Sequence, residues 1–257
     1  MDFLPVEENL RQSFRVLAIG RPRSDVLDLP GLTIASLGAK FQMFNAAFLN
    51  SHTTQTEFER SLDTAREHFQ TRGIAWSFWI CEDWLDRPLR RKLSQTCQKY
   101  GLRLSSEMPG MVAPRIDQPK RPLPRLDYRL VDGPRVLEDF RGIGSVCFHV
   151  PIDWFSEVFD ERLPSSRPDF RCWVGYFEGM PVATAAGVLS KSVFGLYNVA
   201  TAPGHRGRGF AEAITRHAAA EAGNLPLVLQ STSHGLRLYE RLGFRAVTRI
   251  LVYNSAR

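Results

Sequence analysis

The chain has 257 residues, of which 44% are hydrophobic, enough for one large core or two modest ones. No run reaches the roughly 18 apolar residues of a membrane helix, and the first residues do not resemble a secretion signal, so we expect a cytoplasmic protein with no membrane partner. The four cysteines lack metal-ligand spacing, so no bound metal is expected. The net charge of +6 is spread evenly, with 17 basic and 14 acidic residues up to Pro122 and 16 and 13 after it, so no nucleic-acid partner is expected.

The first part of the chain alternates predicted strands and helices. Apolar runs and period-two alternation predict strands over residues 32–36, 41–49, 74–80 and 102–112. Helical spacing predicts helices over residues 6–17, 54–71 and 87–100. Four aromatic residues cluster at the third predicted strand and just beyond it: Trp76, Phe78, Trp79 and Trp84. Core packing is the favoured interpretation, and an aromatic wall of a pocket for a cationic amine is the alternative.

A proline-rich stretch then interrupts the pattern. Residues 114–125 contain four prolines and several charges, which neither a helix nor a central strand tolerates. We therefore predict an N-terminal α/β domain over residues 1–113, a linker over 114–125, and a C-terminal domain over 126–257.

The C-terminal part again mixes strands and helices. The pattern predicts strands over residues 128–131, 171–177, 181–189, 192–201, 225–230 and 246–253. It predicts helices over residues 134–147, 154–159, 209–222 and 233–242. The order favours a mixed α/β fold in which a mostly antiparallel, twisted sheet is flanked by helices.

The most informative segment is the glycine-rich loop between residues 199 and 211. It follows a predicted strand and begins a helix, so its backbone N–H groups and the helix dipole favour a bound phosphate. Gly207 and Gly209 allow close approach of the ligand, and Arg206 and Arg208 supply charged donors. The loop lacks the third glycine of a dinucleotide fingerprint and the Gly-Lys-Ser/Thr ending of a P-loop. A surface turn that caps the helix is the structural alternative.

A second motif lies between residues 229 and 244. Thr232 or Ser233 can cap a short helix, and Gly243 can end it. This packing explains the leucines of the segment, but it does not require a tyrosine at position 239.

Together, the two segments resemble the signatures of the GNAT superfamily of N-acetyltransferases. Arg206-Gly207-Arg208-Gly209-Phe210-Ala211 is similar to its Arg/Gln-x-x-Gly-x-Gly/Ala loop, and residues 238–244 are similar to its Leu-Tyr-x-x-x-Gly-Phe motif. The resemblance implies the GNAT fold, with the loop binding the pyrophosphate of coenzyme A. It further implies that Val199, Ala200 and Thr201 pair with the pantetheine arm and that Tyr239 is the general acid. Thr232 stands where the family often has an asparagine that contacts the cofactor.

The implied function is transfer of an acetyl group from acetyl-CoA, as co-substrate, to a primary amine of a small molecule or peptide, by direct attack in a ternary complex. The amine has to lose a proton, yet the predicted strand over residues 192–201 carries no carboxylate, so the general base is unassigned. Gln230 is a weaker candidate for positioning water. Two alternatives are a non-catalytic acyl-CoA-binding regulator and an aminoacyl-tRNA-dependent transferase with tandem domains of this fold. The N-terminal domain resembles half of the same fold without either motif, and a homodimer is compatible with the sequence.

Overall fold

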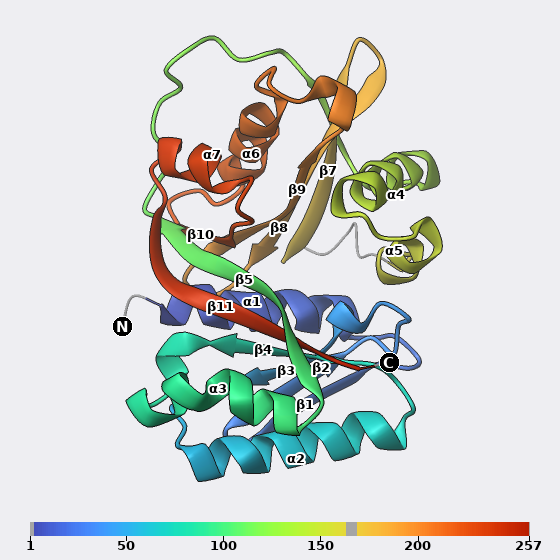
Figure 1. Cartoon of the computed structure of the whole chain (residues 1–257). Helices are drawn as coiled ribbons and strands as arrows, with labels where there is room; N and C mark the ends of the chain where they lie inside the picture. Colours follow the sequence, from blue (N-terminus) through green and yellow to red (C-terminus); the bar gives the residue numbers. More distant parts are fainter. Residues whose placement is uncertain (1–2, 163–168, 257) are drawn as a thin grey trace.

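The computed structural model describes residues 3–162 and 169–256, and within these residues one sheet runs through both halves of the molecule (Figure 1). The strands are β1 (Asp25–Leu29), β2 (Leu32–Ser36), β3 (Asn45–Leu49), β4 (Ser77–Cys81), β5 (Leu102–Ala113), β6 (Asp127–Leu130), β7 (Phe170–Phe177), β8 (Met180–Leu189), β9 (Phe194–Thr201), β10 (Leu227–Gln230) and β11 (Arg245–Ser255). The helices are α1 (Leu4–Ala18), α2 (Gln55–Thr71), α3 (Arg87–Lys99), α4 (Pro134–Phe148), α5 (Ile152–Val158), α6 (Phe210–Ala220) and α7 (Leu236–Arg241). All of these helices in the described residues are too short or too polar to span a lipid bilayer.

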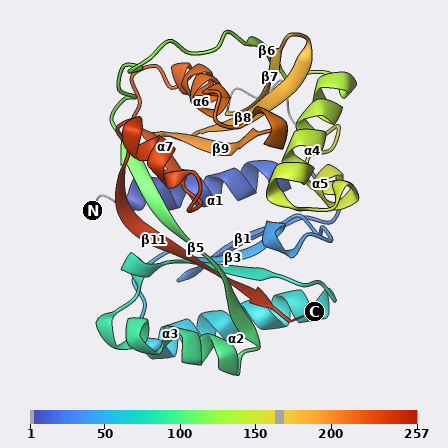
Figure 2. The same ribbon diagram turned by 45° about the horizontal axis from the view of Figure 1, so that its top comes forward.

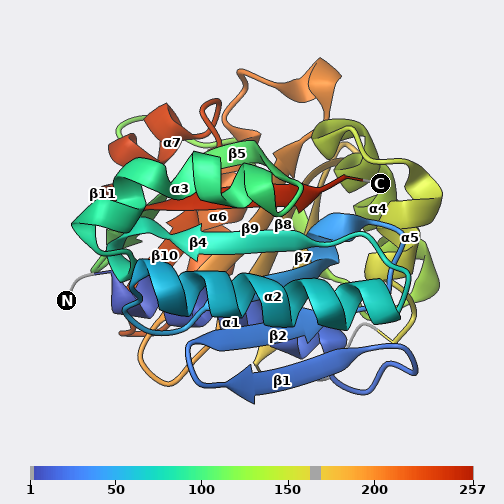
Figure 3. The same ribbon diagram turned by 60° about the horizontal axis from the view of Figure 1, so that its bottom comes forward.

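The strand order in the sheet is β1-β2-β3-β4-β11-β5-β10-β9-β8-β7-β6. Neighbouring strands are antiparallel except for the pairs β3–β4 and β9–β10, which are parallel. Helices flank the sheet in both halves, with α2 and α3 covering one face of the N-terminal strands (Figure 3). The predicted class, a mostly antiparallel mixed sheet flanked by helices, is confirmed.

The two halves repeat one arrangement. The N-terminal half follows the order β1-β2-β3-α2-β4-α3-β5, and the C-terminal half follows β7-β8-β9-α6-β10-α7-β11. In each half the third strand runs parallel to the fourth, and a helix connects the two. This shared order supports the interpretation of the N-terminal half as a second, incomplete copy of the fold.

The halves exchange their last strands. β11 lies between β4 and β5, and β5 lies between β11 and β10. Ten residue pairs join β5 to β11, from Arg245 opposite Val112 to Ser255 opposite Leu102. Each half therefore completes the sheet of the other. Residues 114–126 contain no helix or strand, while the domain boundaries stay a prediction.

Helix α1 fills the space between the halves (Figure 2). Its Phe14 ring packs against Phe48 and Trp79 of the N-terminal half, with ring centroids 5.0 and 5.1 Å away. On its other side, Val6 packs with Val228 of β10. The helix consequently shields apolar surface of both halves at once.

Most predicted elements are present within a few residues of their predicted bounds, but β1 was missed. The aromatic cluster at β4 belongs to the core. Trp76 stacks on Phe69 of α2 at a centroid distance of 5.0 Å, and Phe78 is completely buried. Trp79 faces α1 instead, as strand alternation predicts. Core packing, rather than a pocket wall, is thus the role of these rings.

Candidate active site

An opening in the sheet between β9 and β10 forms the centre of the site. The two strands pair only at Phe194 and Gly195, opposite Leu227 and Val228, and then separate. Beyond this point β9 keeps β8 as its neighbour, with a β-bulge at which Asn198 takes a left-handed φ of 48°. The backbone of residues 199–201 therefore faces β10 without a strand partner on that side, as a pantetheine-binding edge requires.

The glycine-rich loop connects this open strand to α6. Gly207 and Gly209 have φ values of 76° and 89°, a region that favours glycine. Phe210 is buried at the start of α6, and Ile214 and Ala218 continue the same buried face, as predicted. Within the residues that the structure describes, no side chain caps the first turn of α6. Its free N–H groups lie beside the open edge of β9, and this is a suitable arrangement for an anion.

The two arginines of the loop are exposed and rest on neighbouring groups. Arg206 donates from Nε to the carbonyl of Thr201 at 3.3 Å. The Arg208 guanidinium lies over the rings of Phe177 and Phe210, at 4.9 and 5.1 Å from their centroids. Both guanidinium groups are accessible, and these contacts hold them close to the loop.

The predicted linker runs over the same region, which the sequence did not indicate. The carbonyl of Asp117 accepts a 2.6 Å hydrogen bond from Arg216 of α6, and its N–H donates to Leu242 at the end of α7. Farther along, a Cβ at Gly209 would lie 3.2 Å from Cδ of Pro124 and 3.8 Å from Nη2 of Arg121. The linker therefore brings a third guanidinium to the glycine-rich loop.

Tyr239 lies on α7 with its side chain turned into the C-terminal core. Its ring meets Phe244 edge-on at 5.8 Å and is 8% exposed. Gly243, with φ of 94°, ends the helix, and the Phe244 N–H bonds back to the Tyr239 carbonyl, as the predicted stop requires. Burial raises the pKa of the Tyr239 hydroxyl above its usual range, so the phenol stays protonated at neutral pH.

Three polar side chains around the opening differ in their exposure and in their hydrogen bonds. Thr232 is exposed and accepts the Gly235 N–H at 3.3 Å, so it caps the first turn before α7. By contrast, the Thr201 hydroxyl and the Gln230 Nε2 are buried, and neither has a hydrogen-bond partner in the described residues. Unpaired polar atoms of this kind are uncommon in native proteins. Their places, at the ends of β9 and β10, fit a ligand bound in the opening.

Two further residues of the site region have structural contacts. The Cys147 thiol on α4 donates to the Thr201 carbonyl, with a sulfur–oxygen distance of 3.2 Å. His205 ends a short 3₁₀ turn, Pro203–His205, and its ring approaches Phe210 at 6.1 Å. These contacts fix the two ends of the loop segment against α4 and α6.

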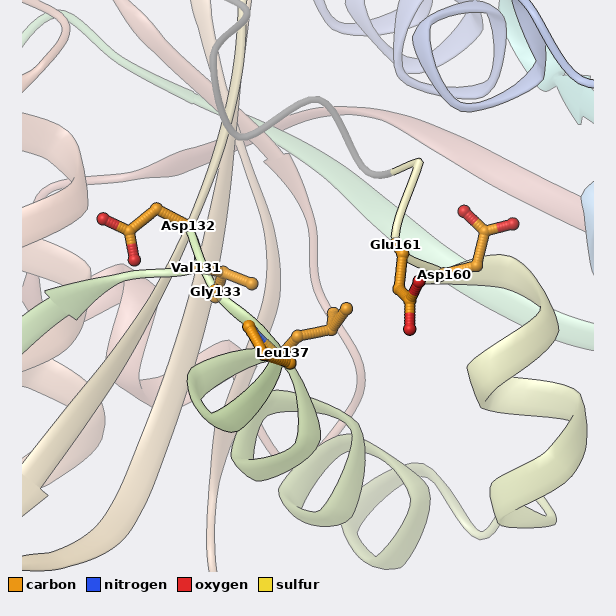
Figure 4. Close-up of a pocket in the computed structure, with 7 residues that line it drawn as sticks. Val131, Asp132, Gly133, Leu137, Asp160 and Glu161 are labelled. Atoms are coloured by element: carbon orange, nitrogen blue, oxygen red, sulfur yellow. The ribbon is translucent and has the colours of Figure 1, made fainter.

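A hollow of about 290 Å³ lies elsewhere, at the start of α4 (Figure 4). Its lining includes the carboxylates of Asp132, Asp160 and Glu161. It borders the end of β6, whereas Thr201 aligns, across β8 and β7, with the beginning of β6. The hollow is therefore separate from the glycine-rich loop. No cluster of His, Cys, Asp and Glu in the described residues is arranged to hold a metal ion.

The separated parallel strands, the glycine-rich helix start and the last helix with Tyr239 are arranged as in the GNAT fold. Residues 168–246 match the family model of the acetyltransferase (GNAT) domain, in agreement with the motifs of the C-terminal part. No curated protein matches the chain.

Solved structures resemble the chain over almost its whole length. A GCN5-related N-acetyltransferase from Kribbella flavida shares 17% identity over 98% of this chain and 95% of its own, with a TM-score of 0.72. A functionally unknown conserved protein from Staphylococcus epidermidis shares 12% identity over 92% of this chain and 95% of its own, with a TM-score of 0.67. A GCN5-related N-acetyltransferase from Sphaerobacter thermophilus shares 15% identity over 88% and 76%, with a TM-score of 0.59. At these identities the likeness concerns the fold, and it includes the N-terminal half.

Proposed function

We propose that the protein is an N-acetyltransferase that transfers the acetyl group of acetyl-CoA to a primary amine of a small molecule or peptide. The observation that carries this proposal is the junction of β9 and α6. An open strand edge leads directly into an uncapped helix start with two left-handed glycines. In acetyl-CoA the thioester arm is attached to a pyrophosphate. The arm requires the open strand edge, and the pyrophosphate requires the helix start that follows it.

The residues of the junction divide the binding of acetyl-CoA between them. The backbone of Val199, Ala200 and Thr201 would pair with the pantetheine arm, since β10 has separated from β9 at this point. Residues 206–211 would hold the pyrophosphate through their backbone N–H groups and the two arginines. The exposed Thr232 would contact the cofactor from the turn before α7.

The chemical step is a direct attack on the thioester. The neutral amine nitrogen forms a bond to the carbonyl carbon, the carbon–sulfur bond breaks, and the amine proton leaves to solvent. The sulfur departs as a thiol when the Tyr239 hydroxyl donates its proton to it, and solvent then returns a proton to the phenolate. Burial raises the pKa of Tyr239, so the hydroxyl carries its proton at neutral pH and is present as a donor when the thiolate leaves.

The proposal is tested in two stages. Calorimetry of the full chain with acetyl-CoA measures binding, and release of free coenzyme A thiol measures turnover with a diamine, an amino sugar and a short peptide with a free N-terminus. The N-acetylated form of each amine is the matched control, because it offers no nucleophile. Absence of acetyl-CoA binding would contradict the proposal. Binding without turnover would indicate an acyl-CoA-binding protein without catalysis.

A further inference from the structure

A buried asparagine on α1 reaches across to the open strand of the site. Asn9 is completely buried, and its Oδ1 accepts a 2.7 Å hydrogen bond from the Tyr197 hydroxyl on β9. Its Nδ2 donates to the Val188 carbonyl on β8 at 3.1 Å. Because both ends of the amide are engaged, the Asn9 side chain has one orientation, and it fixes the direction of the Tyr197 O–H bond.

The strand leaves room for this contact at Gly195. A Cβ at this position would lie 1.8 Å from Oδ1 of Asn9 and 2.6 Å from the Tyr197 ring. Glycine in the interior of a strand weakens it, and its presence often marks a close approach by another group. Gly195 is also the last residue of β9 that pairs with β10. The close approach of α1 therefore occurs where the sheet begins to open.

Tyr197 lies just beyond that point and is partly exposed in the middle of the sheet. Its ring packs with the clusters on the α1 and α4 side, whereas the adjacent Leu196 packs with the α6 and α7 cluster that contains Tyr239. On β10, the Gln230 side chain lies near the phenol, and its Nε2 forms no hydrogen bond within the described residues. Ser13 of α1 also lies near the phenol, and its hydroxyl donates to the Leu10 carbonyl at 2.7 Å. By strand alternation Gln230 lies, like Val228, on the α1 side of the sheet, whereas Leu229 packs in the cluster that contains Tyr239.

We infer that Tyr197 accepts a hydrogen bond from the acceptor amine, and that Asn9 of the N-terminal half is the positioning residue for its hydroxyl. This inference rests on the proposed function. Since the phenol proton is committed to Asn9, the oxygen lone pairs point elsewhere and accept an N–H of the incoming amine. The nitrogen lone pair is then free to face the thioester carbon. Tyr197 would orient the nucleophile from one face of the sheet, and Tyr239 would protonate the leaving sulfur from the other.

Tyr197 is not the missing base in this scheme. Burial raises the pKa of its hydroxyl above the usual range, so the phenol is neutral when the amine binds. Its contribution is alignment, which accelerates a bimolecular step by holding the reacting atoms in a productive geometry. The amine proton still passes to solvent.

The first test is Tyr197→Phe in the full chain. We expect kcat/KM for the amine to fall by about 10- to 100-fold while the Kd for acetyl-CoA changes less than about twofold. The matched control is Tyr253→Phe, which removes a hydroxyl bonded to Ser94 at 3.0 Å in the N-terminal core. That control should retain wild-type turnover.

The second test separates positioning from folding with a double-mutant cycle. Asn9→Leu should lower kcat/KM about three- to tenfold in the wild-type background but cause no further loss in the Tyr197→Phe background. A purely structural asparagine would cost the same in both. Should Tyr197→Phe alone not fold, the double variant takes its place, because it leaves no unpaired amide oxygen beside the ring.

The outcomes distinguish the inference from the proposed function. Wild-type protein that neither binds acetyl-CoA nor acetylates any amine contradicts the proposed function. Wild-type protein that acetylates, together with a folded Tyr197→Phe variant of unchanged kcat/KM, overturns the inference alone. Equal losses from Asn9→Leu in both backgrounds overturn the role of Asn9.

Discussion

The loops that lead into α2 and α6 occupy equivalent places in the two halves, yet their helices begin in opposite ways. In the first turn of α2, Glu57 folds back, and one of its carboxylate oxygens accepts the Thr54 N–H at 2.9 Å and the Thr54 hydroxyl at 2.8 Å. The Thr54 backbone hydrogen bond, and then its hydroxyl, hold the pKa of Glu57 below its usual range. The start of α6 has no such cap and has Gly209 instead. The start of α2 is closed by a carboxylate of the protein, whereas the start of α6 has no side-chain cap in the described residues.

The last helices of the two halves, α3 and α7, also differ at matching positions. Gly101 and Gly243 both have left-handed φ values, 73° and 94°, just after α3 and α7. Four residues before these glycines, α3 has Cys97 and α7 has Tyr239. Burial raises the pKa of the Cys97 thiol to about 12, and the side chain lies in the N-terminal core. The N-terminal copy thus has neither an open helix start before α2 nor a tyrosine at the matching position of α3, and it contributes strand β5 and helix α1 instead.

The largest expected effect tests whether the halves are separable. A fragment of residues 126–257 lacks α1, β4 and β5, so β10 loses one strand neighbour and β11 loses both, and we expect no cooperative folding. Circular dichroism and thermal melting measure this. The matched control is the full chain cleaved within residues 114–125, whose pieces should stay together because β5 and β11 remain paired. A folded 126–257 fragment that binds acetyl-CoA would show that the halves are independent.

The next effect concerns the open helix start. Gly209→Val forces a branched residue into a left-handed conformation and places its Cβ against Pro124, so we expect acetyl-CoA affinity to fall by about 100-fold or more. Gly223→Val is the matched control, because its φ is also positive, at 56°, and open space surrounds it. Calorimetry measures the acetyl-CoA affinity of both variants, and a loss confined to Gly209→Val indicates damage to the binding site rather than backbone strain in general. Unchanged affinity in a folded Gly209→Val protein would remove the loop from the cofactor site.

The difference between α3 and α7 predicts a smaller, purely catalytic effect. Tyr239→Phe retains the ring and removes the proton, so kcat should fall at least about tenfold while acetyl-CoA binding changes little. Cys97→Ala at the matching position should lower the melting temperature and leave kcat unchanged. Turnover and melting curves on the two variants give the answer. Wild-type kcat in Tyr239→Phe would mean that the tyrosine only packs.

The smallest effect tests the closed helix start. Thr54→Ala removes the cap of α2, and the free energy of unfolding should fall by about 1 kcal/mol. Acetyl-CoA affinity should stay the same, since the equivalent site in this half is occupied by Glu57. Urea unfolding and calorimetry measure the two quantities. A clear loss of affinity would indicate that the N-terminal half takes part in cofactor binding.

The elements of the fold were largely predictable because their signals are local. Apolar spacing located α2 and β4, and the glycine at position 243 located the end of α7. β1 was missed because it is a short edge strand whose five residues include two aspartates and expose most side chains. The exchange of β5 and β11 was not predictable, since either strand could pair within its own half, and only distant contacts decide between the partners.

The candidate site shows the same division. The motifs around Gly209 and Tyr239 are contiguous in sequence, so their pattern indicated a place and a role. Asn9 lies 188 residues from Tyr197, and an asparagine within an amphipathic helix gives no local sign of such a contact. Arg121 and Pro124 fall in a stretch whose composition predicts only a linker. Their place beside the loop follows from the path of the chain over α6 and α7.

The position of β11 also governs how the protein forms during synthesis. It is the last of the described strands to leave the ribosome, and yet it becomes an inner strand of the sheet. Until β11 is synthesised, the edges of β4 and β5 that pair with it stay unpaired while more than a hundred further residues are translated. Closure of the sheet is therefore a late event, and a nascent chain that stalls before Arg245 presents two open edges to its neighbours on the polysome.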